Sequence, residues 1–210
     1  DLPILGVNNG GLGFQTSLAE KDDDNAIRYA VGGRCEVTVR SVAEVEMKRK
    51  GKRMGLYRAL NDAVVGRMSP SRMLTLEVAV GGAVVTSYQC DGIIVSTPTG
   101  STGHSLSAGG PILTPDTPAF VLTLICPHTL SWRPVVVPDT RDIMIRVVTD
   151  AAQQLTVDGQ VGCCLRPGDE VFVRRSAEGV RFLHLPGHSY FAVLRQKLRW
   201  SGSNLPPPRV

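Results

Sequence analysis

The sequence consists mostly of short segments rich in apolar and β-branched residues, separated by Gly, Pro, Asn and Asp. Residues 35–40 and 74–80 alternate apolar and polar side chains with a period of two, and after Gly81-Gly82 a second strand-like segment follows at 83–88. Such alternation buries one face of a strand, and turn signals at a spacing of roughly eight to twelve residues are typical of β-sandwiches. The chain is therefore expected to be mainly β, with two packed sheets and few short helices.

Hairpin and helix signals refine this expectation. The basic segment 48–53 lies between strand-like segments at 42–47 and 56–60, and we interpret it as a hairpin turn rather than a nucleic-acid patch. A helix is predicted within 17–31, where acidic residues favour the N-terminal end, and another at 190–200. Further strands are predicted at 2–7, 93–97, 119–125, 134–137, 142–149, 154–157, 170–174 and 180–185, the last two as a pair.

Composition excludes several classes of function. The chain has 210 residues and 42% hydrophobic content, which suits one domain or one domain with a short appendage, and no apolar run reaches the length of a membrane span. A net charge of +4 with 5% aromatic residues suits an anionic small molecule, so neither a nucleic-acid nor a membrane partner is expected. The 5 cysteines form no C-x-x-C pair, which favours a reducing, cytoplasmic location.

The stretch 91–111, DGIIVSTPTGSTGHSLSAGGP, has the pattern of a ligand site. Residues 93–97 read as a buried strand, and residues 99–103 combine hydroxyl side chains with glycines, whose backbone amides can approach a phosphate or a ribose closely. Ser101 or Thr102 is a candidate N-cap of a short helix whose free N–H groups would face the same ligand. From these residues alone, a nucleotide or sugar-phosphate site and a plain turn between core elements are equally open.

Residues 91–139 resemble the central block of the NAD kinases. That family shows DG, an apolar strand, TPTGSTAYSLSAGGP and a CPHSLS-like run ending in RP, and this chain has DGIIV, TPTGSTGHSLSAGGP and CPHTLSWRP in the same order. Shorter pieces agree as well: GVNNGGLGF at 6–14, ALNDAVV at 59–65, VDGQ at 157–160 and YFAVLRQKLRW at 190–200. The resemblance extends over nearly the whole chain.

The resemblance implies a fold and a domain organisation. The expected fold is the mainly β, two-sheet C-terminal domain of NAD kinase, without most of the N-terminal α/β domain. Residues 1–16 would be the last strand and loop of that α/β domain, and 17–186 the β-rich dinucleotide-binding domain. Residues 187–200 would form a C-terminal helix that packs back, and 201–210 a Pro-rich disordered tail.

The resemblance also implies the site residues. Asn61 and Asp62 match a family pair that contacts the dinucleotide, Asp91 would bind a ribose or the nicotinamide end, and Thr99 and Thr102 would read the adenine edge. The other positions expected at the ligand are Phe14, Arg72, Gly103, His104, Ser105, Leu106, Ser107 and Gln160. Gly103 replaces the usual Ala and His104 the usual Tyr, while Gln89 stands where some members have Arg.

The implied reaction is the transfer of the γ-phosphate of ATP to the 2′-hydroxyl of the adenosine ribose of NAD, which gives NADP, with Mg²⁺ or another divalent cation bridging the phosphates. The family's G-G-D-G-T motif, whose Asp is thought to take the hydroxyl proton, is absent from this sequence and is expected upstream of Asp1. We therefore assign no catalytic or metal-binding residue, and this chain alone is not expected to carry the whole activity. The expected partners are NAD and ATP, in a homodimer or homotetramer.

Two alternatives stay open. One is a non-catalytic dinucleotide-binding module, and the other, which the TPTGST and SLSAGGP blocks fit less well, is a relative of the diacylglycerol and sphingosine kinases.

Overall fold

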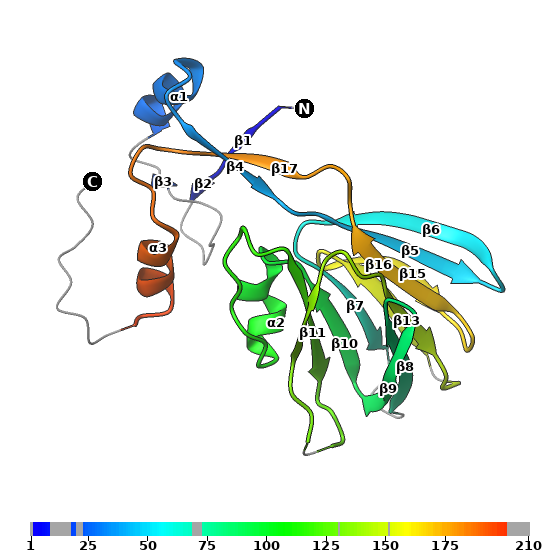
Figure 1. Cartoon of the computed structure of the whole chain (residues 1–210). Helices are drawn as coiled ribbons and strands as arrows, with labels where there is room; N and C mark the ends of the chain where they lie inside the picture. The colour runs from blue at the N-terminus through cyan, green and yellow to red at the C-terminus, as the bar shows by residue number, and fades with distance from the viewer. Residues whose placement is uncertain are drawn as a thin grey trace. The chain divides into compact units, whose positions relative to one another are not determined.

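The computed structural model describes residues 2–8, 18–19, 23–68, 73–129, 131–150 and 152–200. It divides into two compact units, Arg40–Gly179 and a smaller unit made of Asp1–Val39 with Val180–Val210. In the larger unit the described residues form two six-stranded antiparallel sheets, which confirms the predicted mainly β fold (Figure 1). The unit boundaries differ from those expected at residues 16 and 186, and the assignment of those segments to family domains stays a prediction.

The first sheet of the larger unit carries the motifs of the sequence analysis. Its strand order is β12-β11-β10-β7-β14-β15, with β7 hydrogen-bonded between β10 and β14. Every residue of β10 is buried, as expected from its continuous apolar run. The bounds are β7 Asp62–Arg67, β10 Gly92–Ser96, β11 Ala119–Ile125, β12 Val135–Pro138, β14 Gln153–Val157 and β15 Gln160–Leu165.

The second sheet has the order β6-β5-β16-β13-β8-β9. Both predicted hairpins are confirmed in it: β5 pairs with β6 around Lys50-Gly51, and β8 with β9 around Gly81-Gly82. These four turn residues have positive φ, which the glycines adopt without steric cost. The bounds are β5 Ala43–Arg49, β6 Lys52–Ala59, β8 Leu74–Val80, β9 Ala83–Cys90, β13 Ile143–Val147 and β16 Glu170–Arg175.

The core of the larger unit contains the inward-facing residues of both sheets. In β5, β8 and β13 burial alternates along the strand, as the period of two in the sequence predicts. The buried cluster includes Val45, Leu76 and Ile145 from the second sheet and Ile93 and Leu155 from the first. Burying such side chains contributes about 1.5–3 kcal/mol each, so this packing fixes the strand register on which the site depends.

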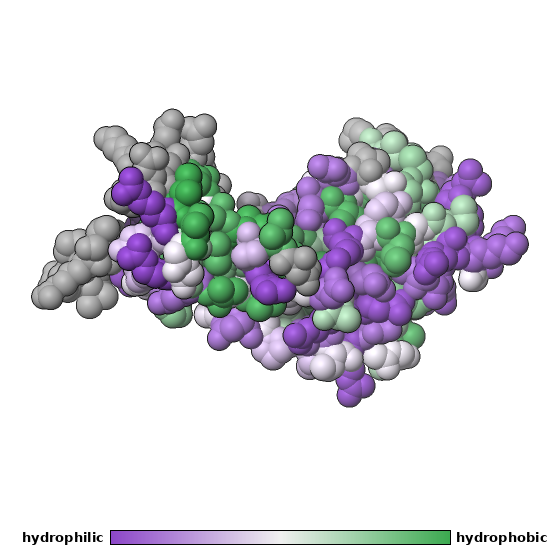
Figure 2. Space-filling view, turned by 90° about the horizontal axis from the view of Figure 1, so that it is seen from above, coloured by the Kyte–Doolittle hydropathy of each residue, from purple (hydrophilic) through white to green (hydrophobic). Residues whose placement is uncertain are grey.

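The smaller unit contains a three-stranded sheet of order β1-β17-β4, in which β1 and β17 are parallel. The predicted pairing of segments 170–174 and 180–185 is wrong, because β16 pairs with β5 and β13 while β17 joins this sheet. Val37 and Val39 of this sheet are 55% and 62% exposed. More generally, the face of the chain drawn in Figure 2 has exposed hydrophobic side chains among the hydrophilic ones. The bounds are β1 Ile4–Leu5, β2 Val7–Asn8, β3 Leu18–Ala19, β4 Glu36–Arg40, β17 Val180–His184, α1 Asp23–Val31 and α3 Tyr190–Lys197.

Both long helices lie where the sequence predicted them. Ser189 caps α3, accepting a hydrogen bond from the backbone N–H of Ala192. None of the described helices has the length and apolar character needed to cross a membrane.

Candidate functional site

Three motif segments leave the first sheet at the same edge. Strand β7 begins at Asp62, next to the last residue of β10, Ser96, and its second residue, Ala63, is paired with the last residue of β14, Val157. Because β7 runs antiparallel to both neighbours, its start lies beside their ends. The structure thus brings together three segments far apart in the sequence: 60–62, 97–107 and 158–160.

Segment 97–107 folds back onto this edge as a 3₁₀ turn, Gly100–Thr102, followed by the single-turn helix α2, His104–Ser107, which lies beside β10 and β11 (Figure 1). The expected N-cap role of Ser101 or Thr102 is wrong. Neither side chain caps α2: Ser101 Oγ donates to the Pro98 carbonyl and accepts from Leu113 N, and Thr102 Oγ1 donates to the Thr99 carbonyl. These hydroxyls therefore hold the loop's own conformation.

Segment 60–62 and the loop are in direct contact. Thr97 Oγ1 donates to the Leu60 carbonyl over 2.6 Å, and Thr97 N donates to the Asn61 carbonyl over 2.9 Å. A Cβ atom on Gly100 would overlap the Asn61 carbonyl oxygen and lie 2.7 Å from its Cα. Only glycine leaves space for the two backbones at this point.

Asp62 is the most buried charged side chain of the site, at 7% exposure. Burial raises the pKa of its carboxyl above the ordinary value, His104 opposes this shift, and the nearby Asp158 carboxylate adds to it. A carboxylate with a raised pKa beside an open loop is a typical feature of functional sites, because folding alone does not favour it.

The remaining loop residues differ in exposure. Ser105 is buried, and the 3.0 Å hydrogen bond between its Oγ and Thr123 Oγ1 attaches the loop to β11. Thr99 Oγ1 is also enclosed, but it has no hydrogen-bond partner among the described residues. A buried hydroxyl in this state costs about 1–3 kcal/mol and calls for an explanation. Gly103, His104 and Ser107 are exposed, Thr102 and Leu106 are half-buried, and Gln160 is exposed just after the Asp158-Gly159 turn.

Asp91 lies away from this group. It directly precedes β10, whereas the loop follows that strand, so about 17 Å of extended chain separates Asp91 from the loop. There its carboxylate forms an ion pair with Arg67 at the end of β7, with 2.8 Å between Oδ2 and Nη2. The structure does not bring Asp91 together with Asn61, Asp62 and the loop. Phe14 and Arg72 lie outside the described residues.

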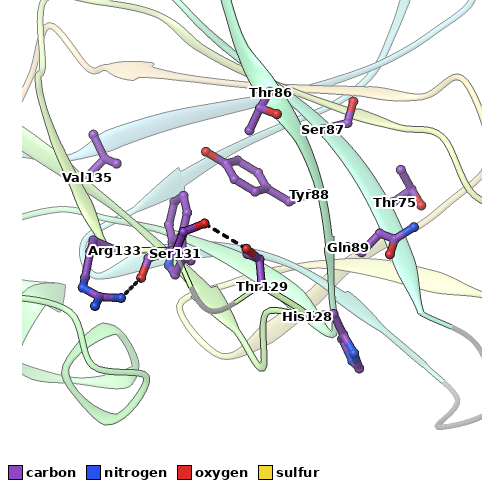
Figure 3. A pocket seen from close by; sticks show the side chains of 11 residues that line it. Thr75, Thr86, Ser87, Tyr88, Gln89, His128, Thr129, Ser131, Arg133 and Val135 are labelled. Atoms are coloured by element: carbon purple, nitrogen blue, oxygen red, sulfur yellow. Dashed lines mark hydrogen bonds between the residues drawn. The ribbon is translucent and has the colours of Figure 1, made fainter.

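A separate open pocket of about 680 Å³ lies along β9, the strand that ends just before Asp91 (Figure 3). Its walls include Gln89, His128 and the edge-on ring pair Tyr88–Trp132, whose centroids are 4.6 Å apart. The backbone N–H of His128 donates to the Gln89 carbonyl, which fixes this wall. Of the residues expected at the dinucleotide, none that the structure describes lines this pocket.

Sequence reasoning missed two groups that shape the site, Thr97 and the carboxylate of Asp158. The Asp-Gly pair signals a hairpin turn, and nothing in the local sequence indicates that the carboxylate binds a segment nearly one hundred residues earlier. In the described part of the chain, no group of three or more His, Cys, Asp or Glu side chains is arranged to hold a metal ion.

Comparison with known proteins identifies the family. A family model for the ATP-NAD kinase C-terminal domain matches residues 60–185. An NAD kinase of Koribacter versatilis is 42% identical over 200 residues, covering 95% of this chain and 70% of that protein. One of Shewanella frigidimarina is 43% identical over 207 residues, covering 98% of this chain and 67% of that protein.

Two solved structures are similar in fold. Yeast NADH kinase complexed with NADH superposes with a TM-score of 0.91 at 29% identity, over 97% of this chain, which spans only 60% of the yeast chain. An NAD kinase from Archaeoglobus fulgidus in complex with ATP gives a TM-score of 0.77 at 29% identity, over 95% of this chain and 75% of that one. These comparisons favour an NAD kinase over a lipid-kinase relative. The chain belongs to the NAD kinase family and carries its C-terminal domain.

Proposed function

We propose that this chain forms the dinucleotide-binding part of an NAD kinase, with NAD lying across the edge where segments 60–62, 97–107 and 158–160 meet. The observation that carries the proposal is the buried, ionisable Asp62 beside the glycine-containing loop. The Thr99 hydroxyl, enclosed without a partner among the described residues, supports it, since a small shift of the loop on binding would give that group a ligand atom to pair with.

The proposed reaction is the phosphorylation of the adenosine ribose 2′-hydroxyl of NAD by ATP. Here the chain's own residues bind and orient the acceptor: Asn61 and Asp62 hold the sugar hydroxyls, and Thr99 and Thr102 hold the adenine edge. Phosphoryl transfer depends largely on such positioning and on charge stabilisation. We place Mg²⁺ on the phosphates of ATP, as part of the substrate, and assign it no protein ligand.

NAD affinity is expected to depend on the protonation state of Asp62. The ionised carboxylate accepts hydrogen bonds from sugar hydroxyls, so affinity should fall as the pH falls through the raised pKa of Asp62, above the range of an ordinary aspartate. Asp62→Asn should bind NAD about tenfold more weakly at neutral pH, a loss of roughly 1.4 kcal/mol. Its affinity should also no longer decrease as the pH falls through this range. Isothermal titration calorimetry with NAD across pH measures both effects.

Thermal stability distinguishes a ligand-binding role of Asp62 from a purely structural one. The folded-state pKa of Asp62 lies above its unfolded value, so stability is lost as the pH rises through that interval. Asp62→Asn removes this cost and should not melt below wild type at neutral pH. The matched control is Asp142→Asn, which replaces an exposed carboxylate before β13. It should keep the wild-type affinity for NAD and the decrease of that affinity at acidic pH. Wild-type affinity in Asp62→Asn would contradict the proposal.

We also propose that the chain associates with copies of itself through the edge strand β9. This strand, AVVTSYQC, contains no charged residue or proline, and Val84 and Val85 are 67% and 47% exposed. Uncharged edge strands readily pair with other chains, whereas the opposite edge strand, β6, carries Lys and Arg.

A charge on β9 is therefore expected to dissociate the assembly. Val85→Lys should elute as a monomer in size-exclusion chromatography with light scattering, because pairing would bury the ammonium group. Met54→Lys, on β6 and 57% exposed in the wild type, should keep the wild-type mass. A monomeric wild type, or an unchanged mass for Val85→Lys, would rule out this interface.

A cytoplasmic location is part of the proposal. It is supported by the 5 cysteines, all of which are free thiols. Cys90 is buried, which raises its pKa to about 11 and makes it unreactive.

A further inference from the structure

The Asp158 carboxylate binds the backbone of the segment that carries Asn61 and Asp62. Its Oδ2 accepts from Leu60 N over 2.8 Å, and its Oδ1 accepts from Asn61 N over 2.7 Å and from Asp62 N over 3.1 Å. The backbone N–H of Asp158 in turn donates to the Asp62 carbonyl over 3.0 Å. Three consecutive N–H groups are thus held by one charged acceptor, and such bonds are about twice as strong as neutral ones.

The same segment is held from its other side by the loop. The Leu60 and Asn61 carbonyls accept hydrogen bonds from Thr97, as described above, and the Thr97 hydroxyl also accepts from Gly100 N over 3.2 Å. Segment 60–62 therefore lies between two sets of polar contacts. Removal of the Asp158 carboxylate would release the N–H groups of segment 60–62, while the carbonyl groups of that segment stay hydrogen-bonded to the loop.

An Asp-Gly turn does not require this arrangement. Asp158 and Gly159 have φ values of 49° and 76°, as expected for a two-residue hairpin turn, and a turn Asp normally bonds to backbone within two residues of itself. Here the three bonds reach residues 96 to 98 positions earlier in the chain. The carboxylate serves the neighbouring segment rather than its own turn.

We propose that Asp158 is a positioning residue for dinucleotide binding: its carboxylate fixes the backbone of residues 60–62 and so sets where Asn61 and Asp62 meet the ligand. This inference rests on the proposed function, because it concerns the same site. Asp158 itself is not assigned a contact with NAD.

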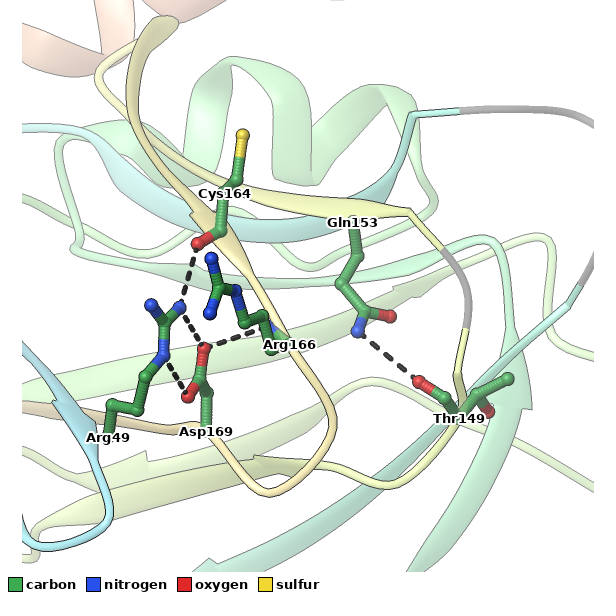
Figure 4. Close-up of polar contacts among 6 residues, drawn as sticks. All are labelled: Arg49, Thr149, Gln153, Cys164, Arg166 and Asp169. Atoms are coloured by element: carbon green, nitrogen blue, oxygen red, sulfur yellow. Dashed lines mark hydrogen bonds and ion pairs between the residues drawn. The ribbon is translucent and has the colours of Figure 1, made fainter.

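Asp169 provides a control for loss of stability, because it is a buried turn carboxylate whereas Asp158 is exposed. It too is a turn carboxylate of the larger unit that accepts from a backbone N–H, that of Arg166, over 2.7 Å (Figure 4). Its Oδ1 also accepts from Arg49 Nε over 2.8 Å and its Oδ2 from Arg49 Nη2 over 2.7 Å. These hydrogen bonds link Asp169 to Arg49 and Arg166 and not to segments 60–62, 97–107 or 158–160. Burial raises the pKa of Asp169, but hydrogen bonds from Arg49 and Arg166 N outweigh it and hold the pKa below the ordinary value. Loss of the carboxylate should therefore lower stability.

The test compares Asp158→Asn, Asp158→Ala and Asp169→Asn by NAD calorimetry, thermal melting and ¹⁵N amide spectra of the whole chain. The Asn side chain keeps the shape but directs an N–H group at one of the three donors. We expect about tenfold weaker NAD binding for Asp158→Asn, a larger loss for Asp158→Ala, and amide shifts at residues 60–62 in both. Asp169→Asn should melt at a lower temperature and bind NAD within about twofold of wild type.

The outcomes separate the two claims. If the wild type binds NAD and Asp158→Asn binds it equally well, the positioning role is overturned and the proposed function stands. Equal losses of affinity in Asp158→Asn and Asp169→Asn would also overturn it, because a general loss of stability would then explain both. If the wild type binds no NAD, the proposed function fails and this inference fails with it.

Discussion

Replacing Gly100 by alanine is expected to lower the affinity for NAD by about a hundredfold, or roughly 2.7 kcal/mol. The added Cβ would overlap the Asn61 carbonyl oxygen and lie 2.7 Å from the Asn61 Cα, and both are backbone atoms that cannot move aside alone. Either the loop or segment 60–62 must shift, which separates the two halves of the proposed site. A displacement of about 1 Å would break hydrogen bonds from these segments to the ligand, and each buried group left unpaired costs about 1–3 kcal/mol. Calorimetry with NAD measures the effect.

The control for this substitution lies three residues away. A Cβ at Gly103 would meet only the Gly100 carbonyl oxygen, at 3.4 Å, and the family usually has Ala there. Gly103→Ala should therefore bind NAD within about twofold of wild type and melt at the same temperature. Circular dichroism on both variants verifies that the β-sheets persist. If Gly100→Ala folded and bound NAD like wild type, the close approach of the two segments would have no role in binding.

An NAD molecule that extends from segments 60–62 and 97–107 to the opposite end of β10 would also meet Asp91. In that case Asp91→Ala should lose at least tenfold in NAD affinity, because a sugar hydroxyl left without its acceptor costs about 1–3 kcal/mol. It should also lose stability, since the 2.8 Å ion pair between Asp91 and Arg67 would be removed. Calorimetry and thermal melting report the two effects separately.

Arg67→Ala distinguishes a ligand contact from an ion pair that serves only the fold. If Asp91 meets the ligand, Arg67→Ala should reduce stability but cost less than about threefold in affinity, well below the effect of Asp91→Ala. Equal losses of affinity in the two variants would mean that Asp91 acts only through Arg67, and its assignment to the ligand would be withdrawn.

The features predicted correctly from the sequence are those that local chemistry determines. Gly81-Gly82 and Lys50-Gly51 lie where a turn requires positive φ, so both hairpins followed from adjacent residues. The buried strand β10 followed from its apolar run. Strand partners are not encoded in this way: segment 180–185 alternates like any half-buried strand, and nothing in it indicates that it pairs in parallel with β1 instead of with β16.

The same distinction applies to the site. Asn61, Asp62 and the 97–107 loop could be assigned to one site only through the family resemblance, and the structure adds the reason, which is the antiparallel register of β7 with β10. Asp91 was grouped with the loop because the two are adjacent in the motif, although a strand of five residues separates them by its whole length. Asp158 was read as a turn residue because its hydrogen bonds are long-range and leave no local pattern.

A crystal structure of the chain with NAD tests the central claim most directly. The account predicts ligand density at the sheet edge beside Asn61, Asp62 and Thr102, with a ligand atom in contact with the Thr99 hydroxyl. Density confined to the pocket along β9, between Tyr88 and His128, with the edge left empty, would contradict it.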